Sequence, residues 1–305
     1  MALENGVGRI ALDSLDEAQV IAKLTQELGV KAHILIRVKP GVHADTHHYI
    51  VTGTEDSKFG FNISDGSASV AIEQLRKMPG IVLRGIHCHI GSQILNLDGF
   101  EKAIEVEELD FGGGLGAEYT SQDTRILIRD YLKSVGAKII EEFQKRKLTL
   151  PTLMLEPGRS IIAEAGTTLY RIGYMKEMPN ELLYVAVNGG MADNIRPALY
   201  GAKHHAMIAN RALEKRTTQI KIVGKCCESG DVLIQEVLLP RPVEGDVLAI
   251  FTTGAYNYSM ASNYNRLPIP GVLLVNEGHY DWIVLPQNYD DIIRNDRIPV
   301  RLQTH

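Results

Sequence analysis

Short apolar runs alternate with longer amphipathic segments over the first part of the chain. Apolar runs that predict strands lie at residues 9–13, 32–38, 81–90, 108–111 and 153–156. Between several of them, apolar residues recur at helical spacing, at 15–28, 67–78 and 124–145. Such alternation is typical of a parallel sheet covered by helices. We therefore predict that residues 1–165 form an α/β domain.

The pattern changes after about residue 165. Runs rich in Val, Ile, Leu and Tyr, separated by Gly, Pro and Asn, now dominate, at 169–175, 183–187, 218–223, 246–250 and 271–275. They predict an antiparallel β domain over residues 166–305. A complete (β/α)8 barrel takes about 250 residues, so the first domain has room for only about five units. It is predicted to be either an open sheet or an incomplete (β/α)8-type barrel.

Composition narrows the classes of function. The 305 residues hold 32 Lys and Arg against 37 Asp and Glu, a net charge of −5, with no basic surplus for a nucleic-acid partner. No apolar run approaches the roughly 18 residues of a membrane span, and the first residues do not resemble a signal peptide. Three cysteines, Cys88, Cys226 and Cys227, cannot form a disulfide framework, which favours a reducing cytoplasm.

Two histidines stand at the end of the third predicted strand. The segment 81–90 runs into HCHIGSQ, and the two-residue period of a strand places His87 and His89 on one face. Gly91 and Ser92 follow, where a turn exposes backbone N–H groups and a hydroxyl. The histidines could simply be buried and hydrogen-bonded. However, ligands of α/β proteins bind at the carboxyl ends of strands, which favours a site.

A run of glycines follows the fourth predicted strand, in ELDFGGGLG at 108–116. Glycine lets the backbone approach a phosphate closely, and successive N–H groups form an anion-binding nest. The spacing of Gly112, Gly114 and Gly116 does not fit the dinucleotide-binding pattern. Both an anion site and a simple tight turn therefore stay open.

Glu156 ends the fifth predicted strand, in LMLEPGRS at 153–160. A carboxylate at that depth needs a cationic or N–H partner to stay ionised. Arg159 could be that partner, and so could a ring nitrogen of a ligand.

The β half carries three further candidates. Cys227 and Glu228 lie in CCESGD, where a cysteine beside acidic residues suits a general acid better than a nucleophile. The segment 193–202 offers Arg196 and Tyr200, an anion-binding group and a phenol. The long polar loop 253–265 is rich in tyrosine, which is typical of a binding loop.

One cluster of metal-ligand residue types is set aside. His43, Asp45, His47 and His48 lie close in sequence, but their spacing matches no standard zinc pattern. We predict no metal site.

Taken in order, eight segments resemble one enzyme family. RVKPG, TGTEDSKFGF, HCHIGSQ, LDFGGGLG, EPGRS, DNIRPALYGA, CCESGD and TGAYNYSMASNYN are similar to segments of the diaminopimelate decarboxylases, from about residue 5 to about residue 295. The resemblance implies a pyridoxal-phosphate enzyme with an alanine-racemase-like barrel followed by a β domain. It also implies the decarboxylation of meso-diaminopimelate to L-lysine and CO2. Ornithine and arginine decarboxylases share the HxHxGS, GGG and EPGR elements, whereas the residues of CESGD and AYNYSMASNYN resemble those of the diaminopimelate branch.

The resemblance also assigns roles in cofactor binding. His89 would stack on the cofactor ring, and Glu156 would keep the pyridine nitrogen protonated. The phosphate would be held by Ser92, Gly113, Gly114, and the backbone at Gly158 and Arg159.

Roles toward the substrate follow in the same way. Arg159, Arg196 and Tyr200 would bind substrate carboxylates, and Tyr256 would touch both the phosphate and the substrate. Cys227 would reprotonate the carbanion, and Glu228 would bind the distal ammonium group. Because the family takes the Cys-Glu loop from a second subunit, the resemblance implies a homodimer with shared sites.

The sequence departs from the family in two places. The family's Tyr-Ala-x-Lys-Ala-Asn element, whose lysine forms the Schiff base with the cofactor, does not occur in the 305 residues. Only eight residues separate Phe100 from Leu109, where the family has a full helix. We therefore expect that residues 1–305 by themselves do not decarboxylate. The alternatives are a catalytically inactive truncated relative and an ornithine- or arginine-type decarboxylase.

Overall fold

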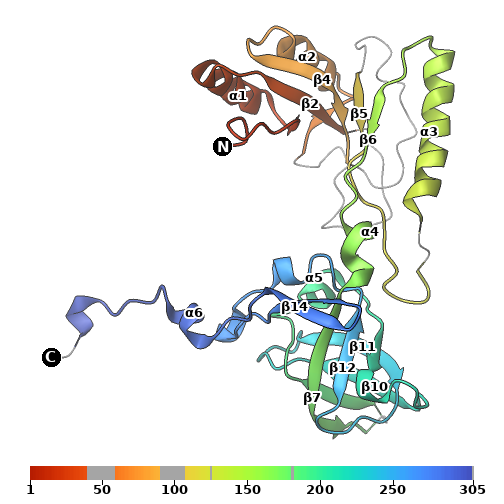
Figure 1. Ribbon diagram of the computed structural model, residues 1–305, viewed down its shortest axis with the longest axis vertical. Coiled ribbons are helices and arrows are strands. Elements are labelled where there is room, and N and C mark those ends of the chain that lie inside the picture. Colours follow the sequence, from red (N-terminus) through yellow and green to blue (C-terminus); the bar gives the residue numbers. More distant parts are fainter. Residues whose placement is uncertain (40–58, 90–106, 124–125, 180–181, 304–305) are drawn as a thin grey trace. The chain divides into compact units, whose positions relative to one another are not determined.

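The computed structural model describes residues 1–39, 59–89, 107–123, 126–179 and 182–303. The chain divides into two compact units (Figure 1). The first comprises residues 1–116 and 125–161, and the second comprises residues 117–124 and 162–305. Ser92 and the histidine-rich cluster at 43–48 lie outside the described residues.

The first unit is built on a parallel sheet that confirms the five predicted strands. Its order is β1-β2-β4-β5-β6, and the short β3 pairs with the end of β2. Every pair is parallel. The bounds are Ile10–Leu12 for β1, Ala32–Lys39 for β2, Phe61–Asn62 for β3, Ile81–His87 for β4, Glu108–Asp110 for β5 and Thr152–Met154 for β6. Parallel strands in sequential order are what a portion of a (β/α) barrel requires.

Helices follow three of these strands at the predicted places. They are α1 (Leu15–Leu28), α2 (Ser67–Leu75) and α3 (Ile128–Lys145). The Ser14 side chain accepts the N–H of Glu17 at the start of α1, and Gly29 ends the helix in the left-handed conformation. The buried faces of the helices, with Ile72 and Phe143 among them, pack on the apolar side chains of the sheet.

An ion pair indicates that this sheet is curved. The guanidinium of Arg9, just before β1, donates through two nitrogens to the carboxylate of Glu108 at the start of β5. β2 and β4 separate these strands. The pair thus spans three strand spacings, about 14 Å in a flat sheet, and curvature brings the two side chains within reach.

The second unit contains a six-stranded sheet in the order β11-β10-β8-β7-β12-β9 and a separate β13-β14 hairpin. The strands are β7 Thr167–Glu177, β8 Leu183–Val187, β9 Ala206–Ile208, β10 Thr218–Val223, β11 Val232–Leu239, β12 Val247–Phe251, β13 Val272–Asn276 and β14 His279–Val284. All pairs are antiparallel except β8 with β10, which are parallel. The predicted antiparallel β domain is confirmed, with this one parallel pair as an exception. Its reason is the long excursion between β8 and β10, which lets the chain re-enter in the same direction.

Short helices complete the two units. They are α4 (Arg159–Ile162), α5 (Arg196–Tyr200) and α6 (Tyr289–Ile293). Within the described residues, none of the helices combines the length and the apolar character needed to cross a bilayer.

The segment 117–124 leaves the first unit and packs within the second. The backbone N–H of His205 donates to the carbonyl of Tyr119 at 2.9 Å. The hydroxyl of Thr252 donates to the carbonyl of Glu118 at 2.7 Å. These bonds hold Tyr119 in the second unit, where its ring faces the guanidinium of Arg196, a residue that the sequence analysis named as a candidate.

Candidate active site

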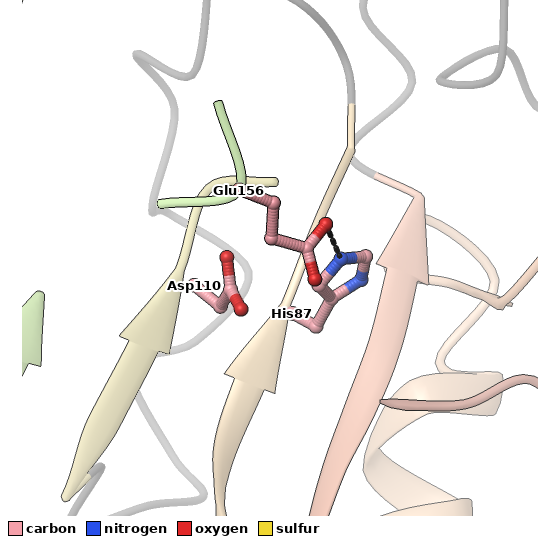
Figure 2. A group of neighbouring side chains, drawn as sticks. All are labelled: His87, Asp110 and Glu156. Atoms are coloured by element: carbon pink, nitrogen blue, oxygen red, sulfur yellow. Dashed lines mark hydrogen bonds and ion pairs between the residues drawn. The ribbon is translucent and has the colours of Figure 1, made fainter. Parts of the chain in front are cut away.

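Three polar side chains meet at the carboxyl ends of β4, β5 and β6 in the first unit. His87 ends β4, Asp110 ends β5, and Glu156 follows β6 (Figure 2). The Nε2 of His87 lies 3.4 Å from a carboxylate oxygen of Glu156. His87 and Asp110 are buried, whereas the side chain of Glu156 is 53% exposed and open to a ligand.

The glycine turn after β5 frames this group. The N–H of Gly112 donates to Asp110 Oδ1 at 2.8 Å, and the carbonyl of Gly112 accepts the N–H of Glu156 at 2.9 Å. The N–H of Gly113 donates to His89 Nδ1 at 3.0 Å. Gly112 has φ +63°, and a Cβ there would overlap the His89 ring. The turn therefore needs glycine at this position.

Burial sets the protonation of the site. Desolvation raises the pKa of the Asp110 carboxyl, and the nearby Glu156 carboxylate adds to this rise. Desolvation lowers the pKa of His89, and the positive charge of Arg37 lowers it further. His89 is thus a neutral imidazole at neutral pH, and its Nδ1 accepts a hydrogen bond. Burial also raises the pKa of the Cys88 thiol to about 12, which leaves it inert.

The group could in principle bind a metal or a ring nitrogen. Ligand atoms of His87, Asp110 and Glu156 lie within 4.8 Å of one another. The Nδ1 of His87 is buried and has no hydrogen-bond partner among the described residues. Beside the group lie a neutral flat imidazole and a glycine-only turn that continues to Gly114, at φ +100°. A carboxylate, a flat ring and a glycine turn together fit an aromatic heterocycle with an anionic tail better than a bare cation.

A second set of predicted residues meets in the second unit. The guanidinium of Arg196, which is 8% exposed, lies 5.4 Å from the ring centroid of Tyr200 and 5.8 Å from that of Tyr256. The ring of Tyr119 lies at 5.8 Å as well. Three aromatic rings therefore surround one buried cation. Tyr256 adopts φ +61°, a strained conformation for a non-glycine residue that is often found at functional sites.

A buried hydrogen-bond network supports the start of α5. The side-chain oxygen of Asn194 accepts the N–H of Arg196 at 3.3 Å, and its Nδ2 lies 3.4 Å from His204 Nε2. The Nδ1 of His204 lies 3.0 Å from the carbonyl of Phe251. Burial lowers the pKa of His204, so this imidazole is neutral beside Arg196.

The Cys-Glu loop is solvent-accessible. Cys227 and Glu228 are exposed, whereas Cys226 is buried. The hydroxyl of Tyr264 donates to a carboxylate oxygen of Glu228. That hydrogen bond raises the pKa of the Tyr264 phenol and holds Glu228 on the surface of the second unit.

Within each unit, the structure brings most of the predicted residues together. His89, Gly113 and Glu156 share the strand-end site of the first unit, and Gly158 and Arg159 follow Glu156 directly. Arg196, Tyr200 and Tyr256 share one cluster in the second unit. Sequence reasoning missed Asp110 and Tyr119, although both flank the glycine run that it singled out.

Comparison with known proteins places the chain in a family. Residues 1–163 match the family described as pyridoxal-dependent decarboxylase, pyridoxal binding domain. The diaminopimelate decarboxylase of Bacillus subtilis is 45% identical over 312 residues, which cover 97% of this chain and 71% of that relative. The chain belongs to the diaminopimelate decarboxylase family. The enzyme of the same name from Staphylococcus aureus is 42% identical, with 97% of this chain and 72% of that relative covered.

Solved diaminopimelate decarboxylases share the fold. The crystal structure from M. jannaschii in complex with L-lysine has a TM-score of 0.88 and 33% identity, over 99% of this chain and 72% of that one. A lysine/ornithine decarboxylase from Vibrio vulnificus, at a TM-score of 0.64 and 20% identity over 87% of this chain and 68% of that one, shows the fold alone. Diaminopimelate decarboxylases are pyridoxal-phosphate-dependent carboxy-lyases. Membership confirms the resemblance read from the motifs, including its cofactor and the barrel-plus-β architecture.

Proposed function

We propose that the protein decarboxylates meso-diaminopimelate to L-lysine and CO2 with pyridoxal phosphate as cofactor, in lysine biosynthesis. The observation that carries the proposal is the strand-end site, where an exposed Glu156 carboxylate, a neutral His89 and a glycine-only turn meet. The relative from M. jannaschii, which was crystallised with L-lysine, supports the choice of product.

The residues of the first unit suit the cofactor. When bound, pyridoxal phosphate accepts the electron pair that the departing carboxylate leaves behind. Glu156 would hold a proton at the ring nitrogen, and the neutral His89 would lie against the ring without repelling that proton. The phosphate would be held by the backbone of Gly113, Gly114 and Gly158–Arg159, together with the Ser92 hydroxyl.

The residues of the second unit suit an amino acid with two charged ends. Arg196 and Tyr200 would bind a substrate carboxylate, because guanidinium groups bind carboxylates in a bidentate manner. The family resemblance assigns the same task to Arg159, which belongs to the first unit. Glu228 would bind the distal ammonium group, and Tyr256 would contact the substrate and the phosphate. Cys227 would return a proton to the α-carbon after CO2 has left.

The proposal extends to assembly and location. The exposed Cys227 and Glu228 fit a loop that completes the site of a second copy, as in a homodimer with shared sites. Three free cysteines, two of them adjacent and one exposed, fit a reducing cytoplasm.

The experiment is a CO2-release assay with meso-diaminopimelate, ornithine and arginine in parallel, with pyridoxal phosphate added. It is run on residues 1–305 and on the product of the reading frame extended upstream of Met1, since the family's Schiff-base lysine is not among the 305 residues. We expect activity in the extended form, with preference for meso-diaminopimelate. Faster release from ornithine or arginine would contradict the substrate assignment, and inactivity of both forms would favour a non-catalytic relative.

A matched pair of variants tests the strand-end site in that assay. Glu156→Gln should lower kcat/KM by roughly a hundredfold or more, because the negative charge that would stabilise the protonated ring nitrogen is lost. Glu107→Gln removes an exposed carboxylate of the same unit, paired with Arg84, and should leave kcat/KM unchanged. Equal activity of the two variants would refute the role of Glu156.

A further inference from the structure

A buried carboxylate lies beneath the loop that carries Cys227 and Glu228. Asp231 is 3% exposed. Its Oδ2 accepts the backbone N–H of Cys226 at 2.7 Å, and its Oδ1 accepts the N–H of Met191 at 2.6 Å. One carboxylate therefore ties together two loops that lie 40 residues apart in sequence.

The two loops leave no spare room around this carboxylate. A Cβ on Gly190 would lie 2.5 Å from Asp231 Oδ2, and a Cβ on Gly224 would overlap the same oxygen. The N–H of Gly224 donates to the carbonyl of Asp231 at 2.9 Å, and the N–H of Lys225 donates to the carbonyl of Gly189 at 2.9 Å. Glycines on both sides thus let two backbones close on a single acceptor.

The first of these loops leads directly to the substrate-binding cluster. Asn194 comes three residues after Met191, and its side chain accepts the N–H of Arg196. The carbonyl of Ala192 accepts the N–H of Ser262 at 2.9 Å, so the tyrosine-rich loop 253–265 is joined to the same framework. Asp231 therefore lies where the segments that carry Cys227, Arg196 and Tyr256 are linked.

We propose that Asp231 is a positioning residue, which holds Cys227 and Glu228 in fixed register with the loop that leads to Arg196. The role of Asp231 in the reaction rests on the proposed function, whereas its role in joining the two loops does not. The carboxylate can serve both loops because it offers two acceptor oxygens. An asparagine keeps only one, so one of the two N–H groups would then face an amide NH2 and lose its partner.

The rate of cysteine alkylation tests whether Asp231 holds the Cys-Glu loop in place, and the test does not require an active enzyme. The protein has three cysteines, of which Cys227 is exposed and Cys226 and Cys88 are buried. The probe is iodoacetamide, with each site followed by peptide mass spectrometry. In Asp231→Asn, we expect Cys226 to react about tenfold to a hundredfold faster than in the unmodified sequence, because a hydrogen bond to a charged acceptor is lost. Burial raises the pKa of the Cys226 thiol and the Asp231 charge raises it further, so loss of the charge also lowers this pKa. The Gly190→Ala variant, which keeps the carboxylate, separates loop opening from this electrostatic effect. Cys88, in the first unit, should stay protected.

Asp246→Asn is the matched control. Asp246 is also 3% exposed in the second unit, but its carboxylate binds Arg211, Asn210 and the N–H of Val243 instead of the Cys-Glu loop. It should destabilise the unit without selectively exposing Cys226. Equal alkylation of Cys226 in the two variants, or no change in Asp231→Asn, would overturn the proposal.

A second pair of variants keeps the Asp231 carboxylate and adds a methyl group to a glycine of one of the two loops. Gly190→Ala places a methyl group against Asp231 and should reproduce the faster alkylation of Cys226. Gly230→Ala lies in the same loop with no atom within 4 Å of the new methyl group, and should behave as the unmodified sequence. Protection of Cys226 in both alanine variants would count against the proposal.

Kinetics connects the loop to the reaction. In an active form, Asp231→Asn should lower kcat, through misplacement of Cys227, and raise KM, through Glu228, by roughly tenfold each if the loop opens to the same extent. Asp246→Asn should leave both unchanged at a temperature where it is folded. Altered alkylation with unchanged kinetics would refute the functional part alone. Failure of both residues 1–305 and the form extended upstream of Met1 to act on meso-diaminopimelate would refute the proposed function, and the alkylation result would still decide the structural part.

Discussion

Alanine at Gly112 should damage the strand-end site by moving His89. Gly112 has φ +63°, and an added Cβ would overlap the ring of His89 at Nδ1. Since the N–H of Gly113 donates to that same nitrogen at 3.0 Å, the ring cannot move away without losing this hydrogen bond. The substitution therefore combines a backbone cost with a displaced imidazole.

The two costs can be estimated separately. A left-handed conformation costs an L-residue about 1–2 kcal/mol, and loss of one neutral hydrogen bond costs about 1 kcal/mol. Gly112→Ala should thus lower the free energy of unfolding of the first unit by about 2–3 kcal/mol. Gly29→Ala is the control, because Gly29 has φ +67° with no atom within 4 Å of the new methyl group. It carries only the backbone cost of about 1–2 kcal/mol.

The free energy of unfolding is measured in urea, with hydrogen exchange on peptides of the first unit as the probe. The affinity for pyridoxal phosphate is measured by equilibrium dialysis. Gly112→Ala should lose cofactor affinity, whereas Gly29→Ala should bind as the unmodified sequence does. The reasoning would be refuted if the two variants were equal both in stability and in cofactor affinity.

Three further outcomes are expected. Burial holds the pKa of His204 below the unfolded value of about 6.5, so the stability that this residue contributes is present above that pH and is lost as pH falls below it. The urea midpoint of the second unit should therefore drop between pH 7.5 and 5.5, and it should drop less in His204→Asn. Tyr119→Ala should raise the Kd for L-lysine by roughly twofold to thirtyfold through the lost cation–π contact with Arg196, whereas Tyr119→Phe should not, as calorimetry would show. Arg9→Met should destabilise the first unit in low salt, because Glu108 loses its partner, and unfolding midpoints that match the unmodified sequence would contradict this.

The barrel part of the fold was predictable because its signals are local. Apolar runs followed by amphipathic segments gave all five main strands, and α1 was predicted with its observed bounds, Leu15–Leu28. The β part was less predictable. β9 (Ala206–Ile208) is short, β11 (Val232–Leu239) is interrupted by Gln and Glu, and β14 (His279–Val284) is largely exposed. Such strands are fixed by their partners more than by their own residues.

Parts of the site could not be read from local pattern. The motifs located His89 and Glu156, because chemistry-bearing residues at strand ends are conspicuous in sequence. Nothing local indicates that Tyr119 leaves the first unit to face Arg196, or that Asp231 lies under two loops 40 residues apart. These contacts depend on long-range packing. Likewise, Asp110 reads as an ordinary strand residue until its hydrogen bond to the Gly112 N–H is seen.

The most direct test of the cofactor site is a crystal structure of the protein with pyridoxal phosphate. We predict cofactor density at the carboxyl ends of β4, β5 and β6, with the ring nitrogen about 3 Å from the Glu156 carboxylate and the ring face against His89. A cofactor bound elsewhere, or one whose ring nitrogen does not contact Glu156, would contradict the assignment of this site.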